Sequence, residues 1–140
     1  LILLVFVIGC GQSQTSQDVA ENLGTSGIYQ SYTQEAYEKA LSENKFVFLN
    51  FYANWCPICK REKPDVVNAL KELNREDLAA FEVNFNDDET DENEKELARK
   101  FGVTYQHTKI ILNRNGEEAF RTLESLDKKE LKEKIVNSLK

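Results

Sequence analysis

The sequence predicts an α/β protein: one mixed central sheet of about four strands, flanked by helices on both faces. Segments with apolar residues at helical spacing alternate with short runs rich in strand-forming residues. One such run, Phe46–Tyr52, is apolar along most of its length, which is typical of a central strand covered on both faces. Asn115 and Gly116 separate the last two strand-like runs and favour a hairpin turn. Alternation of this kind places helices on both faces of a sheet with a hairpin at one edge.

The first expected helix begins at Thr33, a suitable N-cap, and ends near Asn44. After the strand at 46–52, the next helix is expected over 57–74, where apolar residues recur at helical spacing. Pro64 lies inside this helix and should kink it, because proline lacks the backbone N–H that a helix interior uses.

The second half of the chain continues the alternation and ends in a helix. Asp127 and Glu130 have the spacing of a capping box at the start of that helix. The acidic run 87–92 lacks the glycine of a calcium-binding loop, so we interpret it as a solvated, helix-capping stretch. The elements expected here are a strand over 81–85, a helix over 91–101, strands over 109–113 and 118–122, and a helix over 127–139.

Length, charge and cysteine count narrow the class of protein. The 140 residues leave room for one compact domain, and 41% hydrophobic residues can form a core. A net charge of −6 gives no basic field for nucleic acid, which we do not expect as a partner. Three cysteines are too few for a disulfide-stapled scaffold, so cysteine chemistry must be local. We expect a monomer without a cofactor or resident metal.

The N-terminal residues 1–9 are expected to be the apolar part of a secretion signal. Residues 1–8 are all apolar, but they are too few for the roughly 20 residues of a membrane-spanning helix. Because the sequence has no methionine and opens on Leu1, we expect its start to be truncated.

Cys10 follows Gly9 and ends a segment that resembles the lipobox of bacterial-type lipoproteins. We therefore expect Cys10 to be the lipid attachment point; the alternative is a plain signal peptide, or a short apolar N-terminus, with an inert cysteine. Residues 11–27 are rich in Gln, Ser, Thr and Gly, so the segment 10–27 is expected to be a flexible tether. The functional domain is then expected over 28–140.

Cys56 and Cys59 carry the chemistry, because two residues separate them at the junction of a buried strand and a helix. Unpaired N–H groups and the helix dipole favour the thiolate of Cys56, and Pro57 suits the first helical position. We expect Cys56 to be the exposed nucleophile and Cys59 to be the deeper, resolving thiol, with Lys60 and Arg61 adding positive charge. The alternatives are two structural thiols or half of a zinc site; zinc is the weaker of these, since this pair and the single histidine give three ligands where zinc needs four.

This segment resembles the thioredoxin superfamily, and the resemblance extends from about 33 to 139. It rests on the run 51–60, which includes Trp55 and the cysteine pair, and on Pro64, which lies eight residues after Cys56 where the family has a kinking proline. The resemblance implies a thioredoxin-like fold and thiol-disulfide exchange, with Trp55 and Pro57 in the site. Together with the lipobox and tether it implies a membrane-anchored, extracytoplasmic protein of the cell envelope.

Three positions depart from the family pattern. Asn50 stands where thioredoxin has a buried aspartate, and it cannot take a proton from Cys59. Glu82 lies near the position at which thioredoxin has a buried lysine. It is expected to be either a buried carboxylate, whose raised pKa would suit it to accept the proton of Cys59, or an exposed strand residue. His107 replaces the cis-proline of a loop that faces the sulfurs, so we expect a trans loop with His107 within a few ångströms of Cys56.

Two functions of different classes remain. The first is an extracytoplasmic thiol-disulfide oxidoreductase that acts on protein thiols and disulfides and exchanges electrons with a donor in the membrane or envelope. The second is a copper chaperone that binds a soft ion through Cys56, Cys59 and His107. The spacing of the cysteines and the proline at the helix start favour the first.

Overall fold

The computed structural model of the chain describes residues 28–140. The predicted secretion signal, Cys10 and the tether lie outside the described residues. The elements follow in the order β1 (Tyr29–Ser31), α1 (Gln34–Ser42), β2 (Phe46–Tyr52), α2 (Pro57–Leu73), β3 (Leu78–Asn84), α3 (Glu92–Lys100), β4 (Lys109–Leu112), β5 (Glu118–Thr122) and α4 (Lys128–Ser138).

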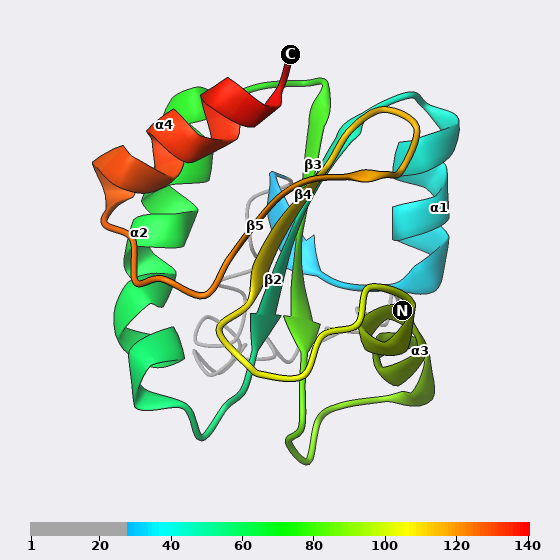
Figure 1. The fold of residues 1–140 in the computed structure, drawn as a ribbon, viewed down its shortest axis with the longest axis vertical. Helices are drawn as coiled ribbons and strands as arrows, with labels where there is room; N and C mark the ends of the chain where they lie inside the picture. Colours follow the sequence, from blue (N-terminus) through cyan, green and yellow to red (C-terminus); the bar gives the residue numbers. More distant parts are fainter. Residues whose placement is uncertain (1–27) are drawn as a thin grey trace, which may run out of the picture.

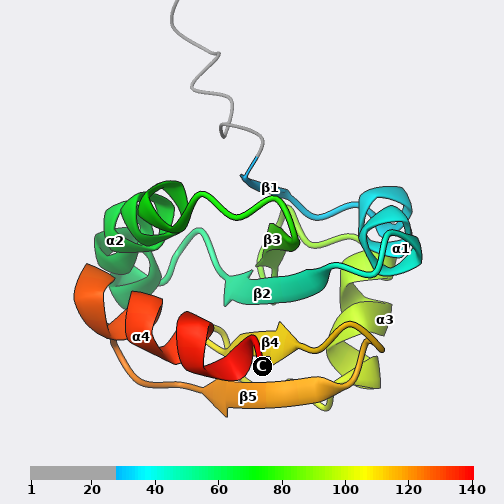
Figure 2. The ribbon, with the colours of Figure 1, turned by 90° about the horizontal axis from the view of Figure 1, so that it is seen from above.

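The five strands form one mixed sheet in the order β1-β3-β2-β4-β5. Strands β1, β3 and β2 are parallel, whereas β4 runs antiparallel to β2 and β5 antiparallel to β4. Helices α2 and α4 cover one face of this sheet, and α1 and α3 cover the other (Figures 1 and 2). The predicted α/β class with helices on both faces is therefore confirmed.

Each face of the sheet has its own hydrophobic core because successive side chains of a strand point to opposite faces. In β2, Val47, Leu49 and Phe51 pack toward α1 and α3, while Phe46 and Phe48 pack toward α2 and α4. The strand is buried from Phe46 to Phe51, which explains its nearly continuous apolar sequence.

Most predicted elements appear close to their expected bounds. Thr33 caps α1, and Asp127 and Glu130 form a capping box at the start of α4. Gly116 adopts a left-handed conformation (φ +77°) in the connection between β4 and β5, as a hairpin turn requires. Helix α2 continues through Pro64 to Leu73.

The prediction of about four strands missed β1, and β3 begins at Leu78 rather than at 81. Strand β1 has three residues, too few for a periodic pattern, and it exists through its pairing with β3. The extra residues of β3 include Ala79 and Ala80, which are weak strand formers. Their pairing with Val47 and Phe48 of β2 decides their conformation.

No helix within residues 28–140 is long and apolar enough to cross a membrane.

Candidate redox site

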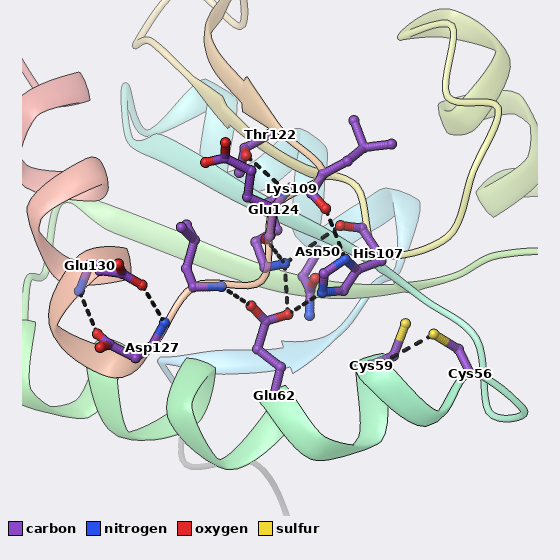
Figure 3. Close-up of polar contacts among 12 residues, drawn as sticks. Asn50, Cys56, Cys59, Glu62, His107, Lys109, Thr122, Glu124, Asp127 and Glu130 are labelled. Atoms are coloured by element: carbon purple, nitrogen blue, oxygen red, sulfur yellow. Dashed lines mark hydrogen bonds and ion pairs between the residues drawn. The ribbon is translucent and has the colours of Figure 1, made fainter.

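The two cysteines lie where β2 leads into α2, at one end of the central sheet (Figures 1 and 3). Cys56 is the N-cap of α2 and Pro57 its first residue, as the sequence predicts. The Cys56 Sγ accepts a hydrogen bond from the backbone N–H of Cys59 (3.3 Å), and both thiols are free. A sulfur that accepts an N–H at a helix N-terminus is stabilised as a thiolate by that bond and by the helix dipole.

The two cysteines do not differ in exposure, because each residue is only 5% exposed. The expectation that Cys56 alone is exposed is wrong: both cysteines belong to a small buried cluster with Ala53, and the partly buried Tyr52 packs against this cluster. The difference between them is electrostatic. Burial and the hydrogen bond to Cys56 raise the pKa of Cys59 to about 11, although Lys109 opposes this shift. Cys59 is therefore a neutral thiol near pH 7, which suits a resolving residue.

Trp55 projects from the loop before α2 and is half exposed. Its indole N–H donates to the carbonyl oxygen of Asn86 (2.9 Å). In the same loop, the backbone N–H of Asn54 donates to Asp87 (2.8 Å) and its side chain to Asp88 (2.6 Å). The acidic run thus anchors the loop before the cysteine pair as well as capping α3.

Asn50 and Glu82 belong to a series of hydrogen bonds that connects β1, β2, β3 and α2. The side-chain amide of Asn50 donates to the Tyr29 hydroxyl (3.0 Å), which donates to Glu82 (3.1 Å). Lys63 completes the series with an ion pair to Glu82 (2.9 Å). The Glu82 carboxylate is partly buried and its polar partners are Tyr29 and Lys63, so the contacts do not connect it to either sulfur. The predicted proton transfer from Cys59 to Glu82 stays a prediction.

The His107 ring contacts other groups than the sulfurs. Its Nε2 lies 2.6 Å from the Glu62 carboxylate and its Nδ1 lies 3.1 Å from the carbonyl oxygen of Leu123. The expected trans backbone is confirmed, since residues 28–140 contain no cis peptide bond. His107 adopts a left-handed conformation (φ +69°), and its N–H donates to the Phe51 carbonyl (2.7 Å). These contacts connect the ring to α2 and to the segment after β5, and the expected closeness of His107 to Cys56 stays a prediction.

The second predicted function required Cys56, Cys59 and His107 to bind a metal together. Within residues 28–140, no group of three or more His, Cys, Asp and Glu side chains is arranged to hold a metal ion. The ring of His107 is occupied by Glu62 and Leu123. The described geometry therefore does not support the copper-chaperone alternative.

Glu62 and Lys109 are buried beside this site and were not among the predicted site residues. The Lys109 ammonium lies 2.8 Å from the Glu62 carboxylate, with side chains 1% and 8% exposed. Two features of the sequence could have identified these residues as buried. Glu62 follows Cys59 by three residues and precedes Val66 by four, which is the spacing of the buried helix face. Lys109 opens the otherwise apolar β4.

An α/β domain with a pair of cysteines at the start of the helix that follows its central strand has the architecture of thioredoxin-like proteins. The family model described as "Thioredoxin" matches residues 28–137, almost all of the described structure. The chain belongs to this family.

Sequence relatives include a thioredoxin-like protein and protein disulfide-isomerases. The chain is 36% identical over 76 residues to "Thioredoxin-like protein YneN" of Bacillus subtilis, with 54% of this chain and 42% of that protein aligned. It is 35% identical over 85 residues to a protein disulfide-isomerase of Gallus gallus, which covers 59% of this chain and 15% of the relative. The chain thus spans less than half the length of these relatives.

Solved structures agree with the fold. Trxlp from Edwardsiella tarda has a TM-score of 0.63 and 28% identity, with 75% of this chain and 95% of that chain covered. A mutant thioredoxin from Halobacterium salinarum has a TM-score of 0.60 at 24% identity, covering 81% and 90% of the two chains.

Proposed function

We propose that the protein is a thiol-disulfide oxidoreductase in which Cys56 is the nucleophile and Cys59 the resolving thiol. The observation that carries this proposal is the asymmetry of the pair. Cys56 Sγ accepts the N–H of Cys59 at the N-terminus of α2, whereas burial raises the pKa of Cys59 to about 11. Membership of the thioredoxin family and the likeness to protein disulfide-isomerases support the same chemistry.

The exchange balances as two successive displacements. The Cys56 thiolate attacks one sulfur of a protein disulfide, forms a mixed disulfide, and releases the other substrate sulfur as a thiolate that takes up a proton. Cys59 then loses its proton and attacks Cys56 Sγ, which releases the second substrate thiol and leaves the Cys56–Cys59 disulfide. Two electrons pass to the substrate, and a dithiol donor must restore the pair. With an oxidised pair and a dithiol substrate the same steps run in reverse.

Trapping of the mixed disulfide tests the two roles. In a Cys10→Ser background, Cys59→Ser should accumulate a covalent adduct with a disulfide-containing model protein, because the second displacement is blocked. Cys56→Ser should form no adduct and should abolish exchange. Non-reducing electrophoresis and mass spectrometry measure both results. The assignment would be reversed if Cys59 in the Cys56→Ser variant formed an adduct as fast as Cys56 does in the Cys59→Ser variant.

We also propose that the protein works outside the cytoplasm as a monomer tethered to a membrane through a lipid on Cys10. The support is the sequence alone: an apolar run, Gly9-Cys10 and a polar segment up to residue 27. Its partners would be protein thiols and disulfides of the cell envelope, with an electron donor in the same compartment. Mass spectrometry of protein extracted from membranes should find a chain that starts at an acylated Cys10. A chain that retains residues 1–9 with an unmodified Cys10 would remove the anchor.

A further inference from the structure

A buried charged network lies next to the redox pair and has no part in the exchange steps above. It consists of Glu62 on α2, Lys109 at the start of β4 and His107 in the loop before β4 (Figure 3). The three side chains are 8%, 1% and 12% exposed. Buried charges are costly unless they are paired, so their arrangement calls for an explanation beyond the stability of the fold.

The Glu62 carboxylate has a partner for each of its oxygens. One oxygen accepts the backbone N–H of Leu126 (2.6 Å), and the other contacts both Lys109 (2.8 Å) and His107 (2.6 Å). Burial alone would raise the pKa of Glu62, but hydrogen bonds from His107, Lys109 and Leu126 lower it to about 2. Glu62 is therefore ionised at neutral pH and can only accept hydrogen bonds.

Both ring nitrogens of His107 thus face groups that cannot donate. Nε2 faces the Glu62 carboxylate and Nδ1 faces the carbonyl oxygen of Leu123. The ring is therefore held at both ends, by α2 and by the segment after β5, and it shares one carboxylate oxygen of Glu62 with Lys109.

The backbone of His107 needs such a constraint. A residue with a side chain in the left-handed region costs about 1–2 kcal/mol, and strained residues persist where their surroundings hold them. The ring contacts supply this constraint, and Lys109 also contacts the carbonyl oxygen of His107 (3.5 Å). The loop that ends at His107 is therefore shaped by Glu62.

Glu62 also links this loop to the cysteines. It lies one helical turn after Cys59 on the same buried face of α2, and both side chains project toward the His107 side of the helix (Figure 3). Lys109, which contacts Glu62, also acts on Cys59: burial is the main cause of the raised pKa of Cys59, and the Lys109 charge opposes it.

We propose that Glu62 is a positioning residue for thiol-disulfide exchange: by holding the ring of His107, it fixes the loop before β4 at the end of the sheet where a protein disulfide must approach Cys56. This inference rests on the proposed oxidoreductase function. It assigns to a buried carboxylate, which Lys109 also contacts, the shaping of the loop that ends at His107.

The test must remove Glu62 without leaving Lys109 as an unpaired buried charge. The double variant Glu62→Leu/Lys109→Leu does this, since an apolar pair of similar volume commonly replaces a buried ion pair without loss of stability. A second variant, His107→Gly, removes the ring, tolerates φ +69° and leaves the Glu62–Lys109 pair intact. Glu94→Gln is the matched control, because Glu94 is also a buried helical glutamate but lies on α3 and bonds to Asn84 and Asp91.

Steady-state disulfide reduction is the first readout, in the full chain with Cys10→Ser. We expect both test variants to lower kcat/KM at least tenfold, mainly through a higher KM, while urea denaturation shows a folded protein and Glu94→Gln keeps its KM. A folded double variant with kcat/KM within twofold of wild type overturns the proposal. If the double variant does not fold, a kcat/KM of the His107→Gly variant within twofold of wild type overturns the proposal.

The second readout is independent of activity. His107 is the only histidine of the chain, so its ring nitrogens give unambiguous nitrogen-15 NMR signals. The wild-type ring should show N–H protons that its contacts with Glu62 and Leu123 protect from exchange with water, and the double variant should lose at least one of them. A wild-type ring without a protected N–H overturns the clamp of Glu62 on the ring. Protected ring N–H protons in a folded wild-type protein that exchanges no disulfide would refute the oxidoreductase function and leave the clamp intact.

Discussion

At the scale of single residues, the hydrogen bonds of the two cysteines distinguish them. Both are equally buried, but Cys56 accepts an N–H at the end of a helix dipole, whereas Cys59 has its neutral form favoured by burial and by Cys56. Pro57 leaves no N–H unpaired at the first position of α2. Neighbouring residues of one helical turn therefore create two thiols of different reactivity.

The raised pKa of Cys59 predicts the order of alkylation. At pH 7 iodoacetamide should modify Cys56 before Cys59 in the reduced Cys10→Ser protein, because Cys59 has almost no thiolate two pH units or more below its pKa of about 11. Tandem mass spectrometry of the peptide that contains both cysteines locates the label. The ultraviolet absorbance of thiolate should show the second titration near pH 11. Equal labelling of both cysteines would contradict this assignment.

The lowered pKa of Glu62 predicts a loss of stability in acid. Its pKa falls from 4.5 in the unfolded chain to about 2 in the folded protein, so the stabilisation is complete above pH 4.5 and is lost as the pH falls toward 2. The shift corresponds to about 3 kcal/mol. Urea denaturation between pH 2 and pH 5 measures it. The Glu62→Leu/Lys109→Leu variant should lack this contribution; an identical acid transition in that variant would mean that other carboxylates cause it.

At the scale of elements, capping contacts fix helix α3 to the end of a neighbouring strand. The N-cap of α3 is Asp91, and it forms a reciprocal capping box with Glu94. Glu94 also accepts the N–H of Asn84 at the end of β3 (2.8 Å), which fixes α3 to the strand. The connection between β3 and α3 carries Asn86 and Asp87, which hold the loop before Cys56. The capping box thus fixes the start of α3 to the end of β3, whereas the contacts to the loop before Cys56 come from Asn86 and Asp87.

Removal of this cap should destabilise the protein without changing its chemistry. Asp91→Ala eliminates the bond to the Glu94 N–H (2.8 Å) and should lower the free energy of unfolding by about 1 kcal/mol. Urea denaturation measures the loss, and the rate of disulfide exchange below the transition should stay within twofold of wild type. Asp91→Asn, which keeps an N-cap acceptor, should recover most of the stability. An unchanged unfolding midpoint for Asp91→Ala would contradict the role of this cap.

At the scale of the whole molecule, the sheet separates two cores and brings the site residues to one end of it. Strand β2 supplies side chains to both cores, and its end leads to the cysteines. On the α1 and α3 side, the ring of Phe81 packs edge-on against Tyr32 and Tyr37. The site therefore depends on the integrity of the central strands.

The central position of Phe81 predicts a large effect of its truncation. Phe81→Ala should lower the free energy of unfolding by about 3–5 kcal/mol, because the side chain is fully buried and leaves a cavity. The same truncation of the partly buried Phe120 on the edge strand β5 should cost clearly less. Urea denaturation of both variants measures the difference. Equal losses would show that β3 is not a central element of the core.

Much of the fold could be predicted from local sequence. The apolar run 46–52, the capping pair Asp127 and Glu130, and the turn at Gly116 each act through residues close in the chain, so their patterns are visible without a structure. The cysteine pair is equally local, because one helical turn brings both sulfurs together at a helix start. These features were therefore determined by the sequence itself.

The tertiary structure alone decided the surroundings of the cysteines. Strand β1 exists through its pairing with β3, and the equal burial of Cys56 and Cys59 results from packing over both. Glu62 and His107 are 45 positions apart, and only the packing of α2 against the sheet brings the carboxylate to the ring. The partner of a buried charge is a property of the assembled interior, since desolvation makes pairing obligatory only after the chain has folded. For that reason the sequence predicted the sulfur chemistry, and the folded interior determined which residues hold the loop beside it.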